Sequence, residues 1–212
     1  MMTSERPTVF IIDDDPSARR GMSRLIQAAG MSVQSYGSAQ DFLDQADNES
    51  HGCIVLDVKM PGLSGLDLQA VLQQKNIALP IIFVSGHSEI PDTAVAMKRG
   101  AIDFLTKPVD RDHLFKAIAE SLEKDRENRK TFSDQEELRK RIKTLSPREY
   151  TILRFVITGM LNKQIAYALS ITEDTVKVHR RRAMRKMGAG SVAELVRFCE
   201  MLAIKPAEVD DV

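Results

Sequence analysis

Short apolar segments alternate with amphipathic stretches along the first 122 residues of the chain. Five of these segments are about five residues long and are bounded by turn-forming residues, which is typical of buried strands. They span residues 8–12, 32–36, 53–57, 80–84 and 101–105. Between them, apolar residues recur at helical spacing. Strands and helices in regular alternation predict a doubly wound α/β fold, in which helices cover both faces of a five-stranded parallel sheet.

Polar residues suited to chemistry occur where four of these predicted strands end. They are Asp13, Asp14, Asp57, Ser85 and Lys107. Because the C-terminal ends of parallel strands share one edge of a sheet, we expect these groups to lie close together. Carboxylate oxygens are the ligands that Mg2+ prefers. An aspartate beside Mg2+ and a lysine is suited to accept a phosphoryl group.

Each of these groups also has an ordinary structural interpretation. Asp57 alone is compatible with a loop carboxylate that caps the next helix, and Asp15 is expected to be a helix cap. Lys107 alone fits a solvated surface lysine, and Phe104 alone fits a core residue. Their joint occurrence at strand ends favours the functional interpretation.

In this order, the motifs resemble the flavodoxin-like receiver domain of two-component response regulators. The carrying motifs are Asp13-Asp14, Asp57 with Met60-Pro61-Gly62, Ser85-Gly86-His87 and Phe104-Leu105-Thr106-Lys107-Pro108. The resemblance covers residues 8–122. It departs from the usual pattern at Ser85, where Thr is common, and at Val109, where Phe is frequent.

The resemblance implies that a sensor histidine kinase phosphorylates Asp57. It also implies that Mg2+ is bound by Asp14, Asp57 and the backbone carbonyl of Lys59, with Asp13 in the outer shell.

The resemblance further implies a switch around the phosphoryl group. Lys107 would pair with the phosphoryl oxygens, Ser85 would donate a hydrogen bond to them, and Phe104 would rotate into the space behind Ser85. The peptide bond between Lys107 and Pro108 would be cis.

Two further side chains are expected to control the lifetime of the phosphorylated state. Lys59 lies two residues past Asp57, and His87 lies two residues past Ser85. Both would flank the path of a hydrolytic water, so we predict that they set the autodephosphorylation rate.

Residues 123–143 are dense in charges of both signs, which favours a solvent-exposed helical linker. Ser133 with Glu136 is a capping-box pattern and predicts a break or kink near residues 131–133. The alternative is a dimeric coiled coil with a thin apolar seam, formed by Leu122, Phe132, Leu138 and Ile142.

The last part of the chain predicts a small all-α domain of four amphipathic helices over residues 144–205, followed by a flexible tail over 206–212. Ser146 and Glu149 form a capping box at the first helix, whose expected buried stripe includes Tyr150. The third helix places apolar residues toward the core and basic residues on its opposite side. The apolar residues are Val176, Ala183 and Met187, and the basic ones are Lys177, Arg181 and Arg185.

Residues 145–198 resemble the LuxR-type helix-turn-helix. The carrying motifs are Leu145-Ser146-Pro147-Arg148-Glu149, Gly159, Asn162-Lys163-Gln164-Ile165-Ala166 and Thr175-Val176-Lys177-Val178-His179. Together the two halves resemble the NarL/FixJ class of response regulators, with receiver (1–122), linker (123–143) and DNA-binding (144–205) parts. The resemblance implies that Lys177, Val178 and Arg181 enter the major groove.

The same resemblance implies contacts to DNA phosphates by Lys163, Thr175 and His179. The tandem arginines at 180–182 are more basic than the site needs, so Arg182 is expected to serve phosphates as well. Proteins of this class bind as homodimers on paired half-sites of double-stranded DNA.

Charge and composition agree with a receiver in the first half of the chain and a DNA-binding domain in the second. The chain has no net charge, but residues 1–123 carry −6 and residues 124–212 carry +6, which favours a nucleic-acid-facing second half. Cys53 and Cys199 lie in apolar patterns and are expected to be core residues. The sequence shows no apolar run of membrane-spanning length and no signal peptide, so we expect a cytoplasmic protein without a membrane partner.

These observations predict a phosphorylation-switched, DNA-binding transcriptional regulator rather than an enzyme with a diffusible product. RNA polymerase is a candidate further partner. One rival is a phosphatase of the dehalogenase-like type, but Lys59 occupies the place of its second aspartate. Another is a constitutive DNA binder whose receiver only dimerises, and the complete acidic pocket argues against it. Neither an acyl-ligand pocket nor a P-loop is evident.

Overall fold

The structure, a computed structural model, describes residues 6–47, 50–86 and 90–208. The chain divides into two compact units, Met1–Arg129 and Lys130–Val212. His87 and the last four residues of the predicted tail lie outside the described residues.

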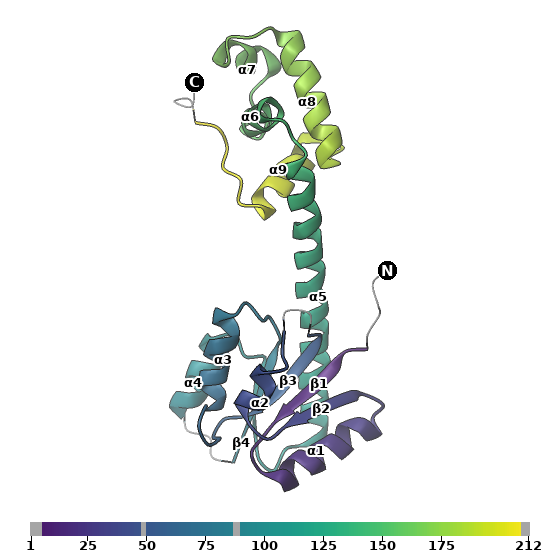
Figure 1. Cartoon of the computed structure of the whole chain (residues 1–212), viewed down its shortest axis with the longest axis vertical. Coiled ribbons are helices and arrows are strands. Elements are labelled where there is room, and N and C mark those ends of the chain that lie inside the picture. Colours follow the sequence, from purple (N-terminus) through teal and green to yellow (C-terminus); the bar gives the residue numbers. More distant parts are fainter. Residues whose placement is uncertain (1–5, 48–49, 87–89, 209–212) are drawn as a thin grey trace. The chain divides into compact units, whose positions relative to one another are not determined.

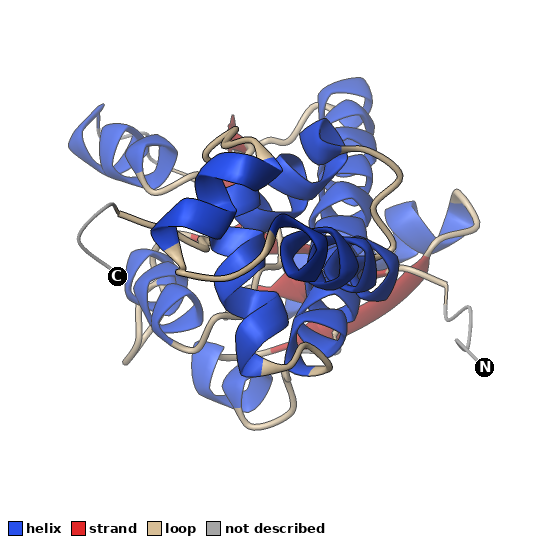
Figure 2. Ribbon diagram, turned by 90° about the horizontal axis from the view of Figure 1, so that it is seen from above, coloured by secondary structure: helices blue, strands red, loops and turns tan. Residues whose placement is uncertain are grey.

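The N-terminal unit contains the predicted five-stranded parallel sheet, with strand order β2-β1-β3-β4-β5 (Figure 1). Its strands are β1 (Thr8–Ile12), β2 (Ser32–Tyr36), β3 (Gly52–Asp57), β4 (Ile81–Ser85) and β5 (Asp103–Thr106). Its helices are α1 (Pro16–Ala28), α2 (Ala39–Leu43), α3 (Gly65–Gln74), α4 (Ile90–Lys98) and the start of α5 (Arg111–Lys143). All described strands belong to this sheet, and the other regular elements are helices (Figure 2). The predicted α/β fold is confirmed.

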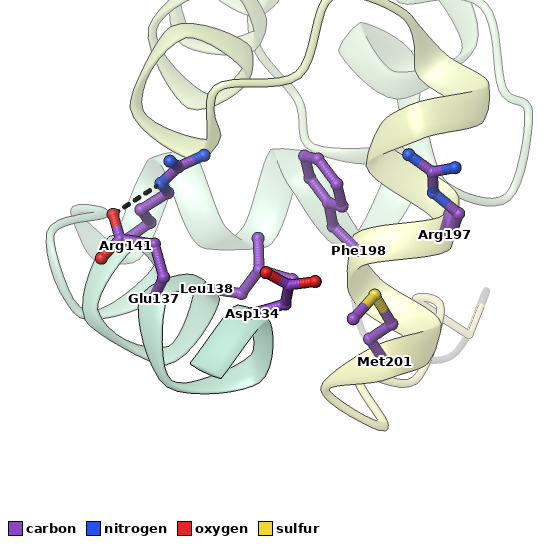
Figure 3. A pocket seen from close by; sticks show the side chains of 7 residues that line it. All are labelled: Asp134, Glu137, Leu138, Arg141, Arg197, Phe198 and Met201. Atoms are coloured by element: carbon purple, nitrogen blue, oxygen red, sulfur yellow. Dashed lines mark hydrogen bonds and ion pairs between the residues drawn. The ribbon is translucent and has the colours of Figure 1, made fainter. Parts of the chain in front are cut away.

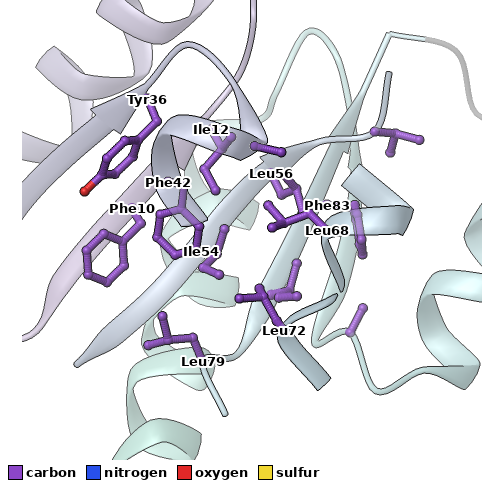
Figure 4. Close-up of a cluster of buried hydrophobic side chains, with 14 of the residues drawn as sticks. Phe10, Ile12, Tyr36, Phe42, Ile54, Leu56, Leu68, Leu72, Leu79 and Phe83 are labelled. Carbon is purple, nitrogen blue, oxygen red and sulfur yellow. The ribbon is translucent and has the colours of Figure 1, made fainter. Parts of the chain in front are cut away.

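Strand residues alternate between two apolar clusters because successive side chains point to opposite faces of a sheet. On one face, Ile54, Leu56 and Phe83 pack with Phe42 of α2 and with Leu68 of α3 (Figure 4). The opposite face packs against α1 and α5 through Val9, Ile11, Cys53, Val55, Ile82, Ile26, Leu114, Ala117 and Ile118. Two covered faces explain why β1, β3 and β4, the inner strands of the sheet, read as nearly continuous apolar runs.

Helix α5 runs without interruption from Arg111 to Lys143, so the break predicted near residues 131–133 is wrong. Its sequence holds no glycine or proline that would interrupt the backbone hydrogen bonds. Ser133 and Glu136 therefore lie inside a helix instead of starting one.

The residues predicted to form an exposed linker are only partly exposed. In the C-terminal unit, Leu138 is 4% exposed and packs in the apolar core together with Ile142. In the N-terminal unit, Asp125 is 3% exposed. Leu138 and Ile142 are thus used within one chain, which leaves Phe132, 62% exposed, as an unburied residue of the proposed coiled-coil seam.

The described part of the C-terminal unit, residues 130–208, contains four further helices, as expected. They are α6 (Pro147–Val156), α7 (Asn162–Ala168), α8 (Glu173–Met187) and α9 (Val192–Met201). The capping box of Ser146 and Glu149 at the start of α6 is present. Tyr150, however, is 39% exposed, whereas Ile152 is fully buried, because the buried stripe of α6 is rotated away from Tyr150.

The described part of the predicted tail is held against α6. The guanidinium of Arg154 donates hydrogen bonds to the carbonyl oxygens of Lys205 and Pro206 at 3.1 and 3.2 Å. The amide of Ala207 in turn donates to the carbonyl of Arg154 at 3.1 Å. Both cysteines are free and buried, as expected for core residues.

Candidate functional site

The C-terminal edge of the sheet brings together two carboxylates and one ammonium that lie far apart in the sequence. Asp13 follows β1 and Asp57 ends β3, and their residues are only 3% and 7% exposed. The Nζ atom of Lys107, just past β5, donates to Oδ2 of Asp13 at 2.8 Å and to Oδ1 of Asp57 at 2.6 Å. The predicted convergence of these three groups is therefore present.

The backbone around these carboxylates fixes their orientation. Oδ1 of Asp13 accepts a hydrogen bond from the amide of Asp15 at 2.8 Å, and Oδ2 of Asp57 accepts one from the amide of Lys59 at 2.9 Å. A Cβ atom at Gly65, the first residue of α3, would overlap the carbonyl oxygen of Asp57. Glycine at this position lets α3 start directly behind the acidic residue.

Burial and charge act in opposite directions on this group of residues. Burial raises the pKa of the Asp57 carboxyl, and the hydrogen bond and charge of Lys107 only partly offset that rise. Burial alone would lower the pKa of Lys107, but hydrogen bonds to Asp13 and Asp57 outweigh it and raise that pKa. The ammonium therefore stays protonated, and two buried carboxylates share a single positive charge.

The donor set at this edge suits a hard divalent cation. Two buried carboxylates, those of Asp13 and Asp57, share the single ammonium of Lys107, and Asp14, the next residue after Asp13, is exposed. The side chains that could bind a metal ion here are carboxylates, and carboxylate oxygens are the ligands that Mg2+ prefers. Within residues 6–47, 50–86 and 90–208, no three His, Cys, Asp or Glu side chains form a ready-made metal cluster. The carboxylates therefore suit Mg2+ by their chemistry and their charge. In this structure the ammonium of Lys107 bridges Asp13 and Asp57.

The predicted switch residues surround the same edge. Ser85 ends β4 and is 3% exposed, and its carbonyl oxygen accepts a hydrogen bond from the amide of Lys107 at 2.8 Å. Phe104 of β5 is half-buried and stacks on Phe83, with ring centroids 6.1 Å apart. The peptide bond between Lys107 and Pro108 is cis, as predicted.

Helix α8 presents a basic face to solvent. Val176, Ala183 and Met187 are buried, as predicted. The exposed residues of α8 include Lys177, Val178, Arg181, Arg182 and Arg185. Thr172 caps the helix, and its hydroxyl accepts from the amide of Thr175. Lys163 is exposed on α7.

Not every basic or polar residue of this region is available to a ligand. Arg180 donates to Oδ1 of Asn162 at 2.8 Å, and Lys186 donates to Oε2 of Glu149 at 2.6 Å. These residues connect α8 to α7 and α6. His179 is half-buried, and its Nδ1 has no hydrogen-bond partner among the described residues.

Two family models match the chain, one in each unit. The model "Response regulator receiver domain" matches residues 9–119, and the model "Bacterial regulatory proteins, luxR family" matches residues 143–199. This chain belongs to the two-component response regulators with a LuxR-type DNA-binding domain. The resemblance to the NarL/FixJ class is confirmed by relatives that match along almost the whole chain.

Three of these relatives show the extent of the similarity to this response regulator. Nodulation protein W of Bradyrhizobium diazoefficiens is 43% identical over 201 residues, which cover 95% of this chain and 88% of the relative. Response regulator protein TodT of Pseudomonas putida is 42% identical over the same shares of the two chains. The solved structure of the response regulator StyR is 43% identical, with a TM-score of 0.79, and the match covers 92% of this chain and 99% of StyR.

A full-length FixJ structure from B. japonicum has a TM-score of 0.57 at 35% identity, and it covers 95% of this response regulator. No helix in the described part of the chain is both long enough and apolar enough to cross a membrane.

Proposed function

We propose that Asp57 accepts a phosphoryl group from a sensor histidine kinase in an Mg2+-dependent reaction. An oxygen of the Asp57 carboxylate attacks the phosphorus of phosphohistidine, the P–N bond breaks, and the imidazole leaves with the bonding electrons. The observation that carries the proposal is the bridge from Lys107 to both Asp13 and Asp57. It places a cation within reach of the oxygens that would carry the transferred charge.

The metal would be held by Asp14, Asp57 and the backbone carbonyl of Lys59, with Asp13 in the outer shell. When bound, it neutralises charge on the phosphoryl oxygens. The chain's own residues fix the acceptor: the amide of Lys59 orients one oxygen of Asp57, and Lys107 orients the other.

The phosphoryl group would then act as a switch. It adds about −1.5 to −2 charge at a buried edge, and the hydroxyl of Ser85 and the ammonium of Lys107 move to meet it. Movement of Ser85 makes room for Phe104, which stacks on Phe83 and is linked to Ser85 through β4 and β5. These shifts alter dimerisation and promoter binding. Lys59 and His87 set the lifetime of the phosphorylated state.

The output is binding to double-stranded promoter DNA. Lys177, Val178 and Arg181 on the exposed face of α8 read base edges in the major groove. Phosphates are contacted by Lys163, Thr175, His179 and Arg182. We expect a homodimer on paired half-sites after activation and RNA polymerase as a further partner. The chain acts as a regulator, and its only chemistry is its own phosphorylation and dephosphorylation.

Phosphoryl transfer is tested by incubating the full chain with a small acyl phosphate, with and without Mg2+, and measuring intact mass. We expect one phosphoryl group on the wild-type chain with Mg2+ and none on Asp57→Asn. Labelling of Asp57→Asn to the wild-type extent, or transfer that is unaffected by chelation of the metal, would contradict the proposal.

A further inference from the structure

The C-terminal end of α8 is capped by a residue from another helix. The last carbonyl groups of a helix have no partners within it and carry negative partial charge. Here the amides of Gly188 and Ala189 donate to the carbonyls of Arg185 and Met184. The carbonyl of Met187 instead accepts a hydrogen bond of 3.1 Å from Nη1 of Arg141, near the end of α5.

The guanidinium of Arg141 is itself held in place. Its Nε atom donates to Oε1 of Glu137, one turn earlier in α5, at 3.1 Å (Figure 3). Gly188 has a φ of 70°, and a Cβ atom at this position would overlap Nη1 of Arg141. Glycine therefore serves both the left-handed backbone and the close approach of the guanidinium.

A second basic residue secures the same end of α8 from the opposite direction. Lys186, in the last turn of α8, donates to the carbonyl of Thr144 at 2.9 Å and to Oε2 of Glu149 at 2.6 Å. Leu138, one turn before Arg141, is buried in the same core as Met187. The C-terminal end of α8 is thus fixed to the end of α5 and the start of α6. Leu138 packs in the core there, Arg141 donates a hydrogen bond to α8, and Lys186 of α8 donates hydrogen bonds in return.

We propose that Arg141 is a positioning residue for DNA recognition. It fixes the C-terminal end of α8, and with it the direction in which Lys177 and Arg181 point. The inference rests on the proposed placement of α8 in the major groove. Arg141 acts through α8, so its loss lowers the affinity for DNA without removing a phosphate contact.

The rival explanation is a direct contact between Arg141 and DNA phosphate. The side chain is 37% exposed, and it lines an open groove of about 470 Å3 between α5 and α9 (Figure 3). The salt dependence of binding separates the two roles. Each lost phosphate contact lowers the slope of log K against log salt by about one, whereas a positioning residue leaves that slope unchanged.

The test measures binding of the full chain to a fluorescent DNA duplex, selected from random sequence by the wild-type chain, by fluorescence anisotropy at several salt concentrations. We compare Arg141→Ala and Arg141→Lys with Arg139→Ala as the matched control. Arg139 lies on the same helix and, among the described residues, pairs only with Glu136, at 2.9 Å. We expect Arg141→Ala to bind about tenfold more weakly with an unchanged salt slope, which corresponds to one lost charge-assisted hydrogen bond. Arg141→Lys recovers most of the affinity, and Arg139→Ala stays within about twofold of wild type.

Recovery of affinity in Arg141→Lys guards against loss of folding, and a second variant tests the same contact from α8. Gly188→Ala displaces the guanidinium and also strains the left-handed backbone. Because Gly188→Ala and Arg141→Ala remove the same contact, the double variant should lose less affinity than the sum of the two separate losses. Wild-type affinity in Arg141→Ala, or a slope lowered by about one, overturns the positioning role. The positioning role is also overturned if the losses of DNA affinity in Arg141→Ala and Gly188→Ala add fully in the double variant.

Arg181→Ala, measured in parallel, separates failure of the inference from failure of the proposed function. If Arg181→Ala loses specific binding while Arg141→Ala does not, only the positioning role is wrong. If Arg181→Ala binds like wild type, α8 is not the recognition helix, and the positioning role fails with it.

Discussion

Asp125 provides a sharp test of how α5 is attached to the sheet. Its buried Oδ2 accepts a hydrogen bond from the amide of Gly52, at the start of β3, at 3.2 Å. The same oxygen pairs with Nδ1 of His51. Replacing Asp125 with Ala leaves a buried amide without an acceptor, which costs about 1–3 kcal/mol. The lost pair with the partly exposed His51 adds at most about 1 kcal/mol. We therefore expect β3 to open more easily by about 2–3 kcal/mol, which is a change of roughly 30- to 150-fold in the opening equilibrium.

Hydrogen exchange of the full chain, followed by mass spectrometry, measures this opening directly. The peptide that contains the start of β3 should exchange faster in Asp125→Ala by that factor. Asp125→Asn keeps an oxygen acceptor for the amide of Gly52 and should fall between Asp125→Ala and wild type. Glu123→Ala is the matched control, because Glu123 is exposed on the same helix and its only ion pair within the described part of the chain is with Arg126, at 3.0 Å. Wild-type exchange in Asp125→Ala, or an equal acceleration in Glu123→Ala, would show that Asp125 does not hold the start of β3.

Three further predictions concern other parts of the chain. The hydrogen bond from Lys186, more than any other contact, lowers the pKa of Glu149 below its ordinary value of 4.5. The ionised Glu149, paired with Lys186, therefore stabilises the folded state fully above about pH 4.5. This stabilisation is lost as the pH falls through the lowered pKa of Glu149. The free energy of unfolding, measured with urea across this pH range, should depend less on pH in Glu149→Gln than in wild type. An equal pH dependence in the two proteins would argue against a stabilising pair of Glu149 and Lys186. Gly65→Ala should destabilise the N-terminal unit by about 1–3 kcal/mol through overlap with the Asp57 carbonyl, and it should slow phosphorylation by acyl phosphate; unchanged melting and labelling would contradict this. Lys59→Ala and His87→Ala should change the autodephosphorylation rate measured by loss of the phosphorylated mass, and unchanged rates in both variants would remove these residues from the lifetime hypothesis.

The sequence predicts the receiver edge well because each of its groups is tied to the end of a strand. Asp13, Asp57 and Lys107 follow apolar segments whose strand character is clear, and a parallel sheet brings such ends together wherever its helices pack. Helix starts were equally predictable where a local motif determines them, as at Ser146 with Glu149.

The burial of Asp125 and Leu138 on α5 could not be predicted from the local sequence pattern. Asp125 lies among charges of both signs, and its acceptor role depends on Gly52, 73 residues away in the chain. Leu138 looks like part of a sparse seam until α6, α8 and α9 provide a core around it. The uninterrupted helix follows from the absence of glycine and proline, a signal that outweighed the capping pattern at Ser133.

The basic residues of α8 show the same limit. The one-signed charge pattern identifies the helix, but it does not separate Arg181, which is exposed, from Arg180 and Lys186, which hydrogen-bond to α7 and α6. That division depends on where neighbouring helices lie. The role of Arg141 as a cap for α8 has the same origin, because its partner is 46 residues away.

The most direct test of phosphorylation-controlled DNA recognition is binding of promoter DNA with and without beryllofluoride and Mg2+, at a stated salt concentration. Asp57→Asn is the control. We expect the phosphoryl analogue to tighten DNA binding by the wild-type chain and to leave the affinity of Asp57→Asn unchanged. Equal affinity in all samples, or tightening that persists in Asp57→Asn, would contradict control of DNA binding through this carboxylate.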